Sequence, residues 1–421
     1  MTRLLLNKFP SRLLPWCVCL AASLFFAYEL TQLHMLNAIS LPLMRDLGLS
    51  GTSFGSLAST YLLADVVFLM PAGMLIDRFS PRRTILVALA LCVIGTFAFA
   101  GASSLAIAAL SHFISGIGNA FCFLSCMILA ARWFPQGKQA FVIGTIITIG
   151  LLGGVIAQAP FALLTEALGW RGALYVDGFI GLGILAVIFL FVHEPREAVP
   201  SPATAIPFWK QFTSCWTRHT VACGIYTGCL NLPVMIIGAM LGNLFLTQIH
   251  GFIPSTAAFI TSLLCLGTII GSPLIGRLAD IRGEKRGLMR LGALSSCLLL
   301  LLLMYMPSSN PLLYAALFFF IGLCTSTQVL GYPAITENTP PHLSGTAMGI
   351  AAVIIMGGAG LLQIAAGALL DMGWNGALEG GVPLYGREAF RLAFVIFPVS
   401  AVVALGMQRY VTENKGFAQA S

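Results

Sequence analysis

The sequence predicts an all-α membrane protein with twelve transmembrane helices in two pseudo-symmetric six-helix bundles. Of the 421 residues, 58% are hydrophobic and 9% are charged, whereas about a quarter of the residues of a soluble domain are charged. Apolar runs long enough to cross a bilayer as helices alternate with short polar turns. A charged motif also occurs twice, half a chain apart, which indicates a duplicated membrane protein.

The helix limits follow from the ends of the apolar runs and from the Gly, Pro and charged residues between them. The first run follows a basic segment, as in a signal peptide, but it is too long, contains Glu29 and Gln32 and has no evident cleavage site. We therefore interpret it as an uncleaved first helix. We expect helices over residues 14–42, 54–76, 84–102, 105–131, 139–166, 172–192, 219–249, 255–277, 288–306, 311–335, 344–370 and 387–411.

One long polar segment, residues 193–217, interrupts the series of apolar runs, and its four prolines would break a continuous helix. We interpret it as a cytoplasmic linker between an N-terminal bundle, residues 1–192, and a C-terminal bundle, residues 218–421. The pair Gly153-Gly154 in the first half has a counterpart, Gly357-Gly358, 204 residues later. This second repeat supports the division into halves.

The basic residues predict the orientation in the membrane. If both termini lie inside, all but four of the 22 lysines and arginines fall in inner segments; the exceptions are Arg45, Arg171, Arg387 and Arg391. The positive-inside rule thus accounts for the net charge of +7, and no nucleic-acid partner is expected. The chain has no N-x-S/T sequon, which fits a multi-pass protein of a bacterial inner membrane with both termini in the cytoplasm.

The repeated motif runs from Gly73 to Arg83 and again from Gly276 to Arg286, and its Gly, Leu, Asp and final Arg recur 203 residues apart. Each copy is predicted to form a glycine-led charged turn between two helices. The pair resembles the cytoplasmic loop G-x-L-A-D-R-x-G-R-K of the major facilitator superfamily (MFS). This resemblance implies the MFS fold, a monomer, and a gating role at the cytoplasmic mouth for Gly73, Asp77, Arg78, Arg82, Gly276, Asp280, Gly283 and Lys285.

Enzyme chemistry finds no support in the sequence. There is no P-loop and no H-E-x-x-H motif, so we expect neither an enzyme, nor a cofactor, nor ATP as the energy source. Cys122 and Cys126 lie one helical turn apart and could be metal ligands, but buried packing is the preferred interpretation. No metal site is predicted.

Ionisable residues inside predicted helices are the candidates for function, because a charge at bilayer depth costs about 2.5–3.5 kcal/mol. Glu29 lies near the middle of the first helix, Asp65 in the second, and His112 in the fourth, where many MFS members carry an arginine. We predict that these three residues couple transport to protons. The alternative for each is a structural hydrogen bond or packing role. For Asp177 we prefer an ion pair with Arg171, and for Glu337 a pair with Arg282 or Arg286.

Neutral polar residues at helical spacing are the predicted contacts to a small-molecule substrate. Titratable residues cluster in the first half and neutral polar residues in the second, which suggests proton handling by the N-terminal bundle and much of the substrate contact by the C-terminal bundle. The predicted substrate-binding residues are Gln32, Asn37, Asn119, Gln328, Tyr332 and Gln363.

The preferred function is proton-coupled import of a small polar organic solute by alternating access. Within the superfamily the chain is similar to the phagosomal-transporter-like nutrient importers of intracellular bacteria, which implies an amino acid, a nucleoside or a similar metabolite. Two alternatives stay open: an exporter or siderophore carrier on the same fold, and a non-transporting membrane sensor. Two copies of the charged motif argue against the sensor.

Overall fold

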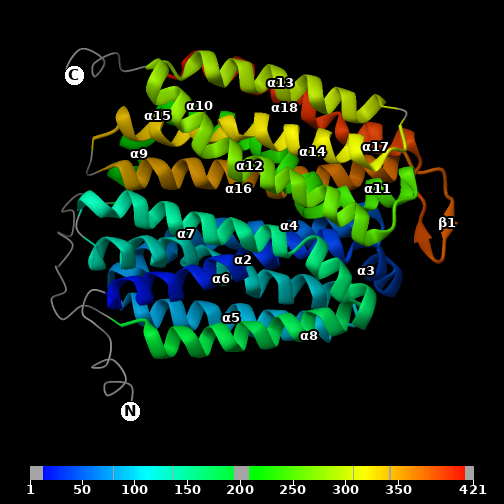
Figure 1. Cartoon of the computed structure of the whole chain (residues 1–421), viewed down its shortest axis with the longest axis horizontal. Coiled ribbons are helices and arrows are strands. Elements are labelled where there is room, and N and C mark those ends of the chain that lie inside the picture. The colour runs from blue at the N-terminus through cyan, green and yellow to red at the C-terminus, as the bar shows by residue number, and fades with distance from the viewer. Residues whose placement is uncertain are drawn as a thin grey trace. The chain divides into compact units, whose positions relative to one another are not determined.

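The computed structural model describes residues 13–78, 80–134, 136–193, 208–306, 308–340 and 343–412. Helices form nearly all of this structure (Figure 1), which confirms the all-α class. The strands in the described ranges, β1 (Leu378–Glu379) and β2 (Val382–Pro383), pair antiparallel in one small hairpin. The chain divides into two compact units: unit 1 comprises Met1–Ile39 and Thr60–Ala203, and unit 2 comprises Ser40–Ser59 and Thr204–Ser421.

Among the described residues, unit 1 contains five helices and most of a sixth, α4, which begins in unit 2. These helices are α2 (Leu14–Ala38), α4 (Gly51–Arg78), α5 (Pro81–Ala100), α6 (Leu105–Trp133), α7 (Gln136–Ile156) and α8 (Ala159–Phe191). Residues 40–59, which the sequence places in the N-terminal bundle, group with unit 2.

Unit 2 contains the remaining helices, several of them in short consecutive pieces. They are α3 (Ser40–Leu47), α9 (Phe208–Cys215), α10 (Arg218–Leu232), η1 (Pro233–Leu241), α11 (Gly242–His250), α12 (Pro254–Arg282), α13 (Arg286–Tyr305), α14 (Pro311–Thr325), η2 (Ser326–Leu330), α15 (Gly331–Glu337), α16 (Ser344–Met372), α17 (Arg387–Phe394), α18 (Ile396–Met407) and η4 (Gln408–Tyr410).

The described residues form eleven segments long and apolar enough to cross a membrane. One of them, Val142–Phe191, has 50 residues; as a helix this length would reach about 75 Å, more than twice the roughly 30 Å of a hydrocarbon core. It therefore accounts for two of the predicted spans. The break between them is Gly169, whose φ of 71° and ψ of 165° are accessible to glycine without steric cost.

Two spans of unit 2 depart from the α-helix. Between α10 and α11, η1 is a π-helix that starts at Pro233, a residue without a backbone N–H to donate. Between α14 and α15, η2 is a 3₁₀ helix. Each irregular helix lies inside a membrane-length segment. The π-helix η1 lies within Arg218–His250, and the 3₁₀ helix η2 lies within Pro311–Glu337. Such local changes of helical type are frequent at functional sites.

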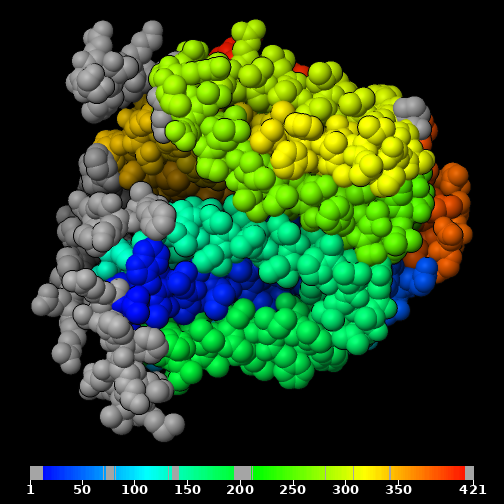
Figure 2. All heavy atoms as spheres, in the orientation of Figure 1, coloured from blue at the N-terminus to red at the C-terminus, as the bar shows by residue number. Residues whose placement is uncertain are grey.

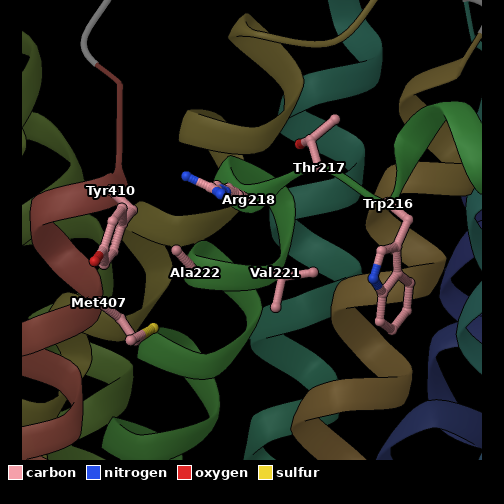
Figure 3. Close-up of a pocket in the computed structure, with 7 residues that line it drawn as sticks. All are labelled: Trp216, Thr217, Arg218, Val221, Ala222, Met407 and Tyr410. Carbon is pink, nitrogen blue, oxygen red and sulfur yellow. The ribbon is translucent and has the colours of Figure 1, made fainter.

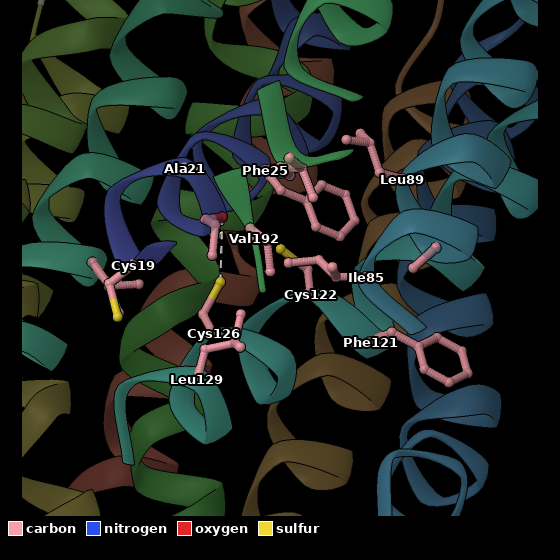
Figure 4. Packing of buried hydrophobic residues seen from close by; sticks show 14 of the residues in the cluster. Cys19, Ala21, Phe25, Ile85, Leu89, Phe121, Cys122, Cys126, Leu129 and Val192 are labelled. Carbon is pink, nitrogen blue, oxygen red and sulfur yellow. Dashed lines mark hydrogen bonds between the residues drawn. The ribbon is translucent and has the colours of Figure 1, made fainter. Parts of the chain in front are cut away.

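The core of unit 1 is formed by apolar side chains and cysteines at the contact of α2, α5 and α6 (Figure 4). Cys122 and Cys126 are both fully buried there. The Cys126 thiol donates to the backbone oxygen of Ala22 at 3.4 Å. These contacts support the packing interpretation of the two cysteines.

Large apolar side chains also cover the outward faces of several helices. On α8 they include Phe179, which is 65% exposed, and on α13 Leu298, which is 68% exposed. Figure 2 shows both helices at the surface, α8 in green and α13 in yellow-green. Extended apolar faces of this kind suit contact with lipid.

Close packing of α2 on α7 depends on Gly153. A β-carbon at this position would lie 1.9 Å from the Ala27 oxygen, and the Thr31 hydroxyl bridges the helices by donating to the Gly153 oxygen at 3.1 Å. We expect Gly153→Ala to destabilise the protein by about 1–3 kcal/mol, because backbone must move. Thermal unfolding in detergent should show a lower melting temperature.

The matched control is Gly144→Ala on the same helix, where an added β-carbon meets no atom within 4 Å. This variant should melt with the wild type. Equal melting temperatures for the two variants would contradict the packing role of Gly153.

Candidate functional site

Buried ionisable side chains distinguish the two units. Among the described residues, the buried Asp, Glu and His side chains all lie in unit 1, and the buried polar side chains of unit 2 are neutral. No lysine or arginine is among these buried side chains. The buried Asp, Glu and His residues are Glu29, His34, Asp65, His112 and Asp177.

Glu29 of α2 is fully buried and faces α4 and α5. Its Oε2 accepts a hydrogen bond from the Tyr61 hydroxyl of α4, which also lies 3.1 Å from the Glu29 backbone oxygen. Its Oε1 has no hydrogen-bond partner of ordinary strength in the described structure; the Cys92 thiol, a weak donor, lies beside it. One oxygen of Glu29 is thus held by a neutral donor, and the other is free to take a proton.

His112 of α6 lies between two aromatic rings. Its ring centroid is 5.0 Å from that of Tyr61 and 5.5 Å from that of Phe99, with the Phe99 ring stacked on it. Neither ring nitrogen has a hydrogen-bond partner within the described ranges. The structure therefore places the predicted coupling histidine directly beside the tyrosine that binds Glu29.

Asp65 lies one helical turn after Tyr61 on α4 and is also buried. The Asn119 side chain of α6 is within hydrogen-bonding reach of this carboxylate. Asp65 is also close enough to Glu29 for the two groups to interact electrostatically. The three predicted coupling residues and Asn119, a predicted substrate contact, thus form one cluster, which we call the carboxylate cluster.

Asp177 of α8 belongs to a second chain of hydrogen bonds. Its Oδ2 accepts from the Gln32 amide of α2. The Gln32 oxygen accepts from the Thr96 hydroxyl at 3.1 Å, and the Tyr28 hydroxyl lies 3.1 Å from the same Thr96 oxygen. The expected ion pair with Arg171 is replaced by this neutral partner on α2, since Arg171 donates to the Ala102 oxygen and stacks over Trp170.

The remaining polar residues of α2 are held by neighbours in unit 1. Asn37 donates to the Gln158 side-chain oxygen at 2.8 Å, next to the break between α7 and α8. His34 lies 2.9 Å from the Leu30 oxygen on its own helix. The structure therefore gives the predicted substrate contact Asn37 a partner at a helix break.

In unit 2 the predicted substrate contacts gather around the two irregular helices. The Gln363 amide of α16 donates to the Met235 oxygen of the π-helix at 2.9 Å, and its own oxygen has no partner among the described residues. Gln328 lies in the 3₁₀ helix, and its backbone oxygen accepts from Thr227 of α10 at 3.0 Å. Tyr332 follows on α15 and is partly exposed.

Both copies of the charged motif are mainly helical, which corrects the expected turn. α4 continues through Gly73 to Arg78 and α5 begins at Pro81, while α12 continues through Gly276 to Arg282 and ends at Gly283 with φ of 64°. Glycine in this left-handed conformation commonly ends an α-helix, because its N–H can then bond to one of the free carbonyl groups of the last turn. The side chains of the predicted gating residues Asp77, Arg78 and Asp280, and the surroundings of Gly73, lie outside the described residues.

The described gating side chains make local contacts within their own units. Arg82 donates to the Phe189 oxygen at 2.7 Å and lies 5.5 Å above the Phe189 ring. Lys285 forms an ion pair with Glu337 of α15, a partner that the sequence analysis did not name for Glu337. Arg286 donates to the Arg409 oxygen.

A polar contact that the sequence did not suggest caps the first turn of α4 inside unit 2. The Asp371 carboxylate of α16 accepts from the backbone N–H groups of Gly51 and Thr52, each at 2.8 Å. The Tyr385 hydroxyl donates to the same carboxylate at 2.6 Å. The carboxylate thus accepts from the first two N–H groups of α4, and Ser50 caps the third by accepting from Ser53 N–H at 3.3 Å.

Tyr61, Thr96 and Asp371 are among the polar residues of these sites that sequence reasoning missed. The spacing of Tyr61 and Asp65 placed both on one face of α4 and could have identified the tyrosine. Asp371 offered no local signal, because the backbone N–H groups that donate to it, those of Gly51 and Thr52, lie 320 and 319 residues away in the chain.

The carboxylate cluster is suited to bind and release protons. A carboxylate taken out of water without a cation is costly in its charged form, and the described partners of Glu29 and Asp65 in the cluster, and of Asp177 outside it, are neutral donors. Each can bind a proton while it is buried and lose it when water or another ligand reaches it.

Comparisons with known proteins agree with this architecture. The Major Facilitator Superfamily model matches residues 18–232 and 223–416. The probable sulfoacetate transporter SauU of Cupriavidus necator is 23% identical over 63% of this chain, and the multidrug resistance protein Stp of Mycobacterium tuberculosis is 23% identical over 69% of it. The chain spans 65% and 64% of the lengths of these two relatives.

A crystal structure of the nucleoside transporter NupG superposes with a TM-score of 0.74 at 15% identity. The match covers 94% of this chain and all of the NupG chain (100%). At this level of identity the likeness shows the fold alone.

Proposed function

This chain belongs to the Major Facilitator Superfamily, and from that premise we propose that it is a proton-coupled secondary transporter of a small polar organic solute. The observation that carries the proposal is the carboxylate cluster: buried Glu29 and Asp65, hydrogen-bonded to neutral partners, with buried His112 beside them. Such groups are costly in a membrane unless they have a task. Proton exchange is the task that their chemistry fits.

In the proposed cycle Glu29 is the principal proton carrier. The Tyr61 hydroxyl holds Oε2, which leaves Oε1 to take the proton. Asp65 lies close enough for its charge to oppose a charge on Glu29. Binding of a solute near Asn119 would change the surroundings of both carboxylates and so link solute binding to proton release.

The chemistry of the cluster favours a neutral or cationic solute. The buried side chains of the described spans include carboxylates, amides and hydroxyls but no lysine or arginine, and an organic dianion would need a cation to offset its charge. An amino acid or a nucleoside meets this requirement, and the similarity in fold to a nucleoside transporter is consistent with it. Sulfoacetate, the substrate named for one relative, does not meet the requirement for a neutral or cationic solute.

We place the protein in a bacterial inner membrane as a monomer with both termini in the cytoplasm. The distribution of basic residues supports this orientation. We infer import as the direction of transport. The alternative is export, which is favoured by the name of one relative, a multidrug resistance protein.

Uptake into proteoliposomes tests the proposal. The purified full-length chain is reconstituted, and labelled nucleosides and amino acids are presented outside with an acidic exterior, with a protonophore, or with no gradient. We expect accumulation that requires the acidic exterior and disappears with the protonophore. Accumulation of a solute only when the interior is acidic would indicate export.

Two further outcomes would remove parts of the proposal. Concentrative uptake that is insensitive to both the pH gradient and the protonophore would exclude proton coupling. Binding of a solute, detected as a thermal shift, without any flux would favour the sensor.

A further inference from the structure

A pocket of about 490 Å³ opens in unit 2 where the span Arg218–His250 begins. Figure 3 shows Met407 and Tyr410 facing Arg218 and Ala222 of α10 across this pocket. It is separate from the carboxylate cluster, which lies in unit 1. The complete lining is Trp216, Thr217, Arg218, Val221, Ala222, Met407 and Tyr410.

The polar groups that line the pocket are mainly hydrogen-bond donors without partners. The Arg218 guanidinium, the Trp216 indole N–H and the Tyr410 hydroxyl make no hydrogen bond or ion pair in the described part of the chain. Guanidinium and indole groups can only donate. No carboxylate lines the pocket, so its electrostatic character suits an anion.

The N-terminus of α10 also favours an anion in this pocket. The Thr217 hydroxyl caps the helix by accepting from Thr220 N–H at 3.1 Å, which leaves the amides of the first two helical residues directed out of the helix. These amides and the helix dipole favour a negative charge at this end. The guanidinium and the helix end thus contribute positive potential to the same pocket.

The first turn of α10 is held firmly in place by His219. Thr412 N–H donates to its Nδ1 at 3.1 Å, so Nε2 carries the proton and donates to the Ala334 oxygen at 2.8 Å. One imidazole therefore ties α10 to α15 and to the residues after η4. A site built on this junction is ordered before a ligand arrives.

The remaining lining side chains, Val221, Ala222 and Met407, are apolar. Trp216 and Tyr410 are each 54% exposed at the limit of a membrane-length helix, where tryptophan and tyrosine commonly mark the boundary between lipid and water. A ligand that satisfies all of these surfaces has an anionic head and an apolar body. We propose that this pocket binds the headgroup phosphate of an anionic phospholipid.

The test compares lipids on the delipidated full-length protein in detergent. Phosphatidylglycerol, phosphatidylcholine or inorganic phosphate is added, and melting temperature and lipid binding are measured by thermal shift and native mass spectrometry. We expect phosphatidylglycerol to raise the melting temperature more than phosphatidylcholine, and inorganic phosphate to have no effect. Arg218→Gln should remove the difference between the two lipids and weaken phosphatidylglycerol binding about fivefold, the loss expected for one arginine near an anionic lipid.

Arg277→Gln is the matched control, because Arg277 is an exposed arginine on α12 that does not line the pocket. It should bind phosphatidylglycerol like the wild type. Equal losses in the two variants would overturn the site in favour of general surface attraction. Stabilisation by inorganic phosphate that depends on Arg218 would overturn the lipid assignment in favour of a soluble anion.

Tyr410→Phe provides a second variant that keeps the aromatic ring and removes one donor. It should weaken phosphatidylglycerol binding by less than Arg218→Gln does, and it serves as the test if Arg218→Gln fails to fold. An unchanged preference for phosphatidylglycerol in this variant would then contradict the proposed donor set.

Discussion

Glu29→Gln is expected to abolish accumulation driven by a pH gradient while counterflow of the same solute continues. Glutamine keeps the size and the hydrogen bonding of a protonated carboxyl, including an acceptor for the Tyr61 hydroxyl, but it cannot release a proton. With one proton per solute, a gradient of one pH unit supports about tenfold accumulation. In the variant, the internal concentration should rise only to the external one.

Two further variants help to interpret this measurement. Glu166→Gln alters an exposed carboxylate on α8 and should accumulate solute like the wild type. His112→Gln separates binding from coupling: loss of counterflow would place His112 at the solute. If Glu29→Gln still concentrates solute, Glu29 is structural, and Asp65 becomes the next candidate.

Asp371→Ala should lower the free energy of unfolding by about 2–3 kcal/mol. The substitution removes the acceptor of two backbone N–H groups and of the Tyr385 hydroxyl, all at 2.6–2.8 Å, and hydrogen bonds to a charged group are among the stronger ones. The first turn of α4 would lose the acceptor of its first two N–H groups. Thermal unfolding of the purified protein should show a melting temperature several degrees lower.

Asp371→Asn and Tyr385→Phe should lower the melting temperature by less than Asp371→Ala does. Asparagine retains one carbonyl acceptor, and phenylalanine removes one of the donors to Asp371, so both variants should melt between Asp371→Ala and the wild type. A wild-type melting temperature for Asp371→Ala would show that water replaces the cap without loss.

The sequence was a good guide to the spans, because their length and composition are set by the bilayer itself. The predicted helix 311–335 is observed as the consecutive pieces from Pro311 to Glu337, and the predicted 219–249 as those from Arg218 to His250. The changes of helical type inside these segments could not be predicted, because a π-turn or a 3₁₀-turn changes hydrogen-bond partners without changing hydropathy. Only Pro233 hinted at one of them.

The site was partly predictable for a similar reason. Glu29, Asp65 and His112 stood out because ionisable groups are rare in apolar helices, and the structure groups them in unit 1. Their partners depend on which helices pack together, which hydropathy does not specify. Asp177 was therefore assigned to nearby Arg171, whereas its observed partner is Gln32, 145 residues away. The predicted coupling and substrate roles stay predictions.

The π-helix Pro233–Leu241 also has an evolutionary consequence. Such segments contain more residues per turn than the α-helix and arise readily when one residue is inserted into it. Loss of one residue between Pro233 and Leu241 can thus be absorbed by a return to α-helical hydrogen bonding. This deletion would rotate the side chains that precede it by about 100° relative to the helix that follows. We expect this span, unlike its neighbours, to show single-residue gaps among related sequences.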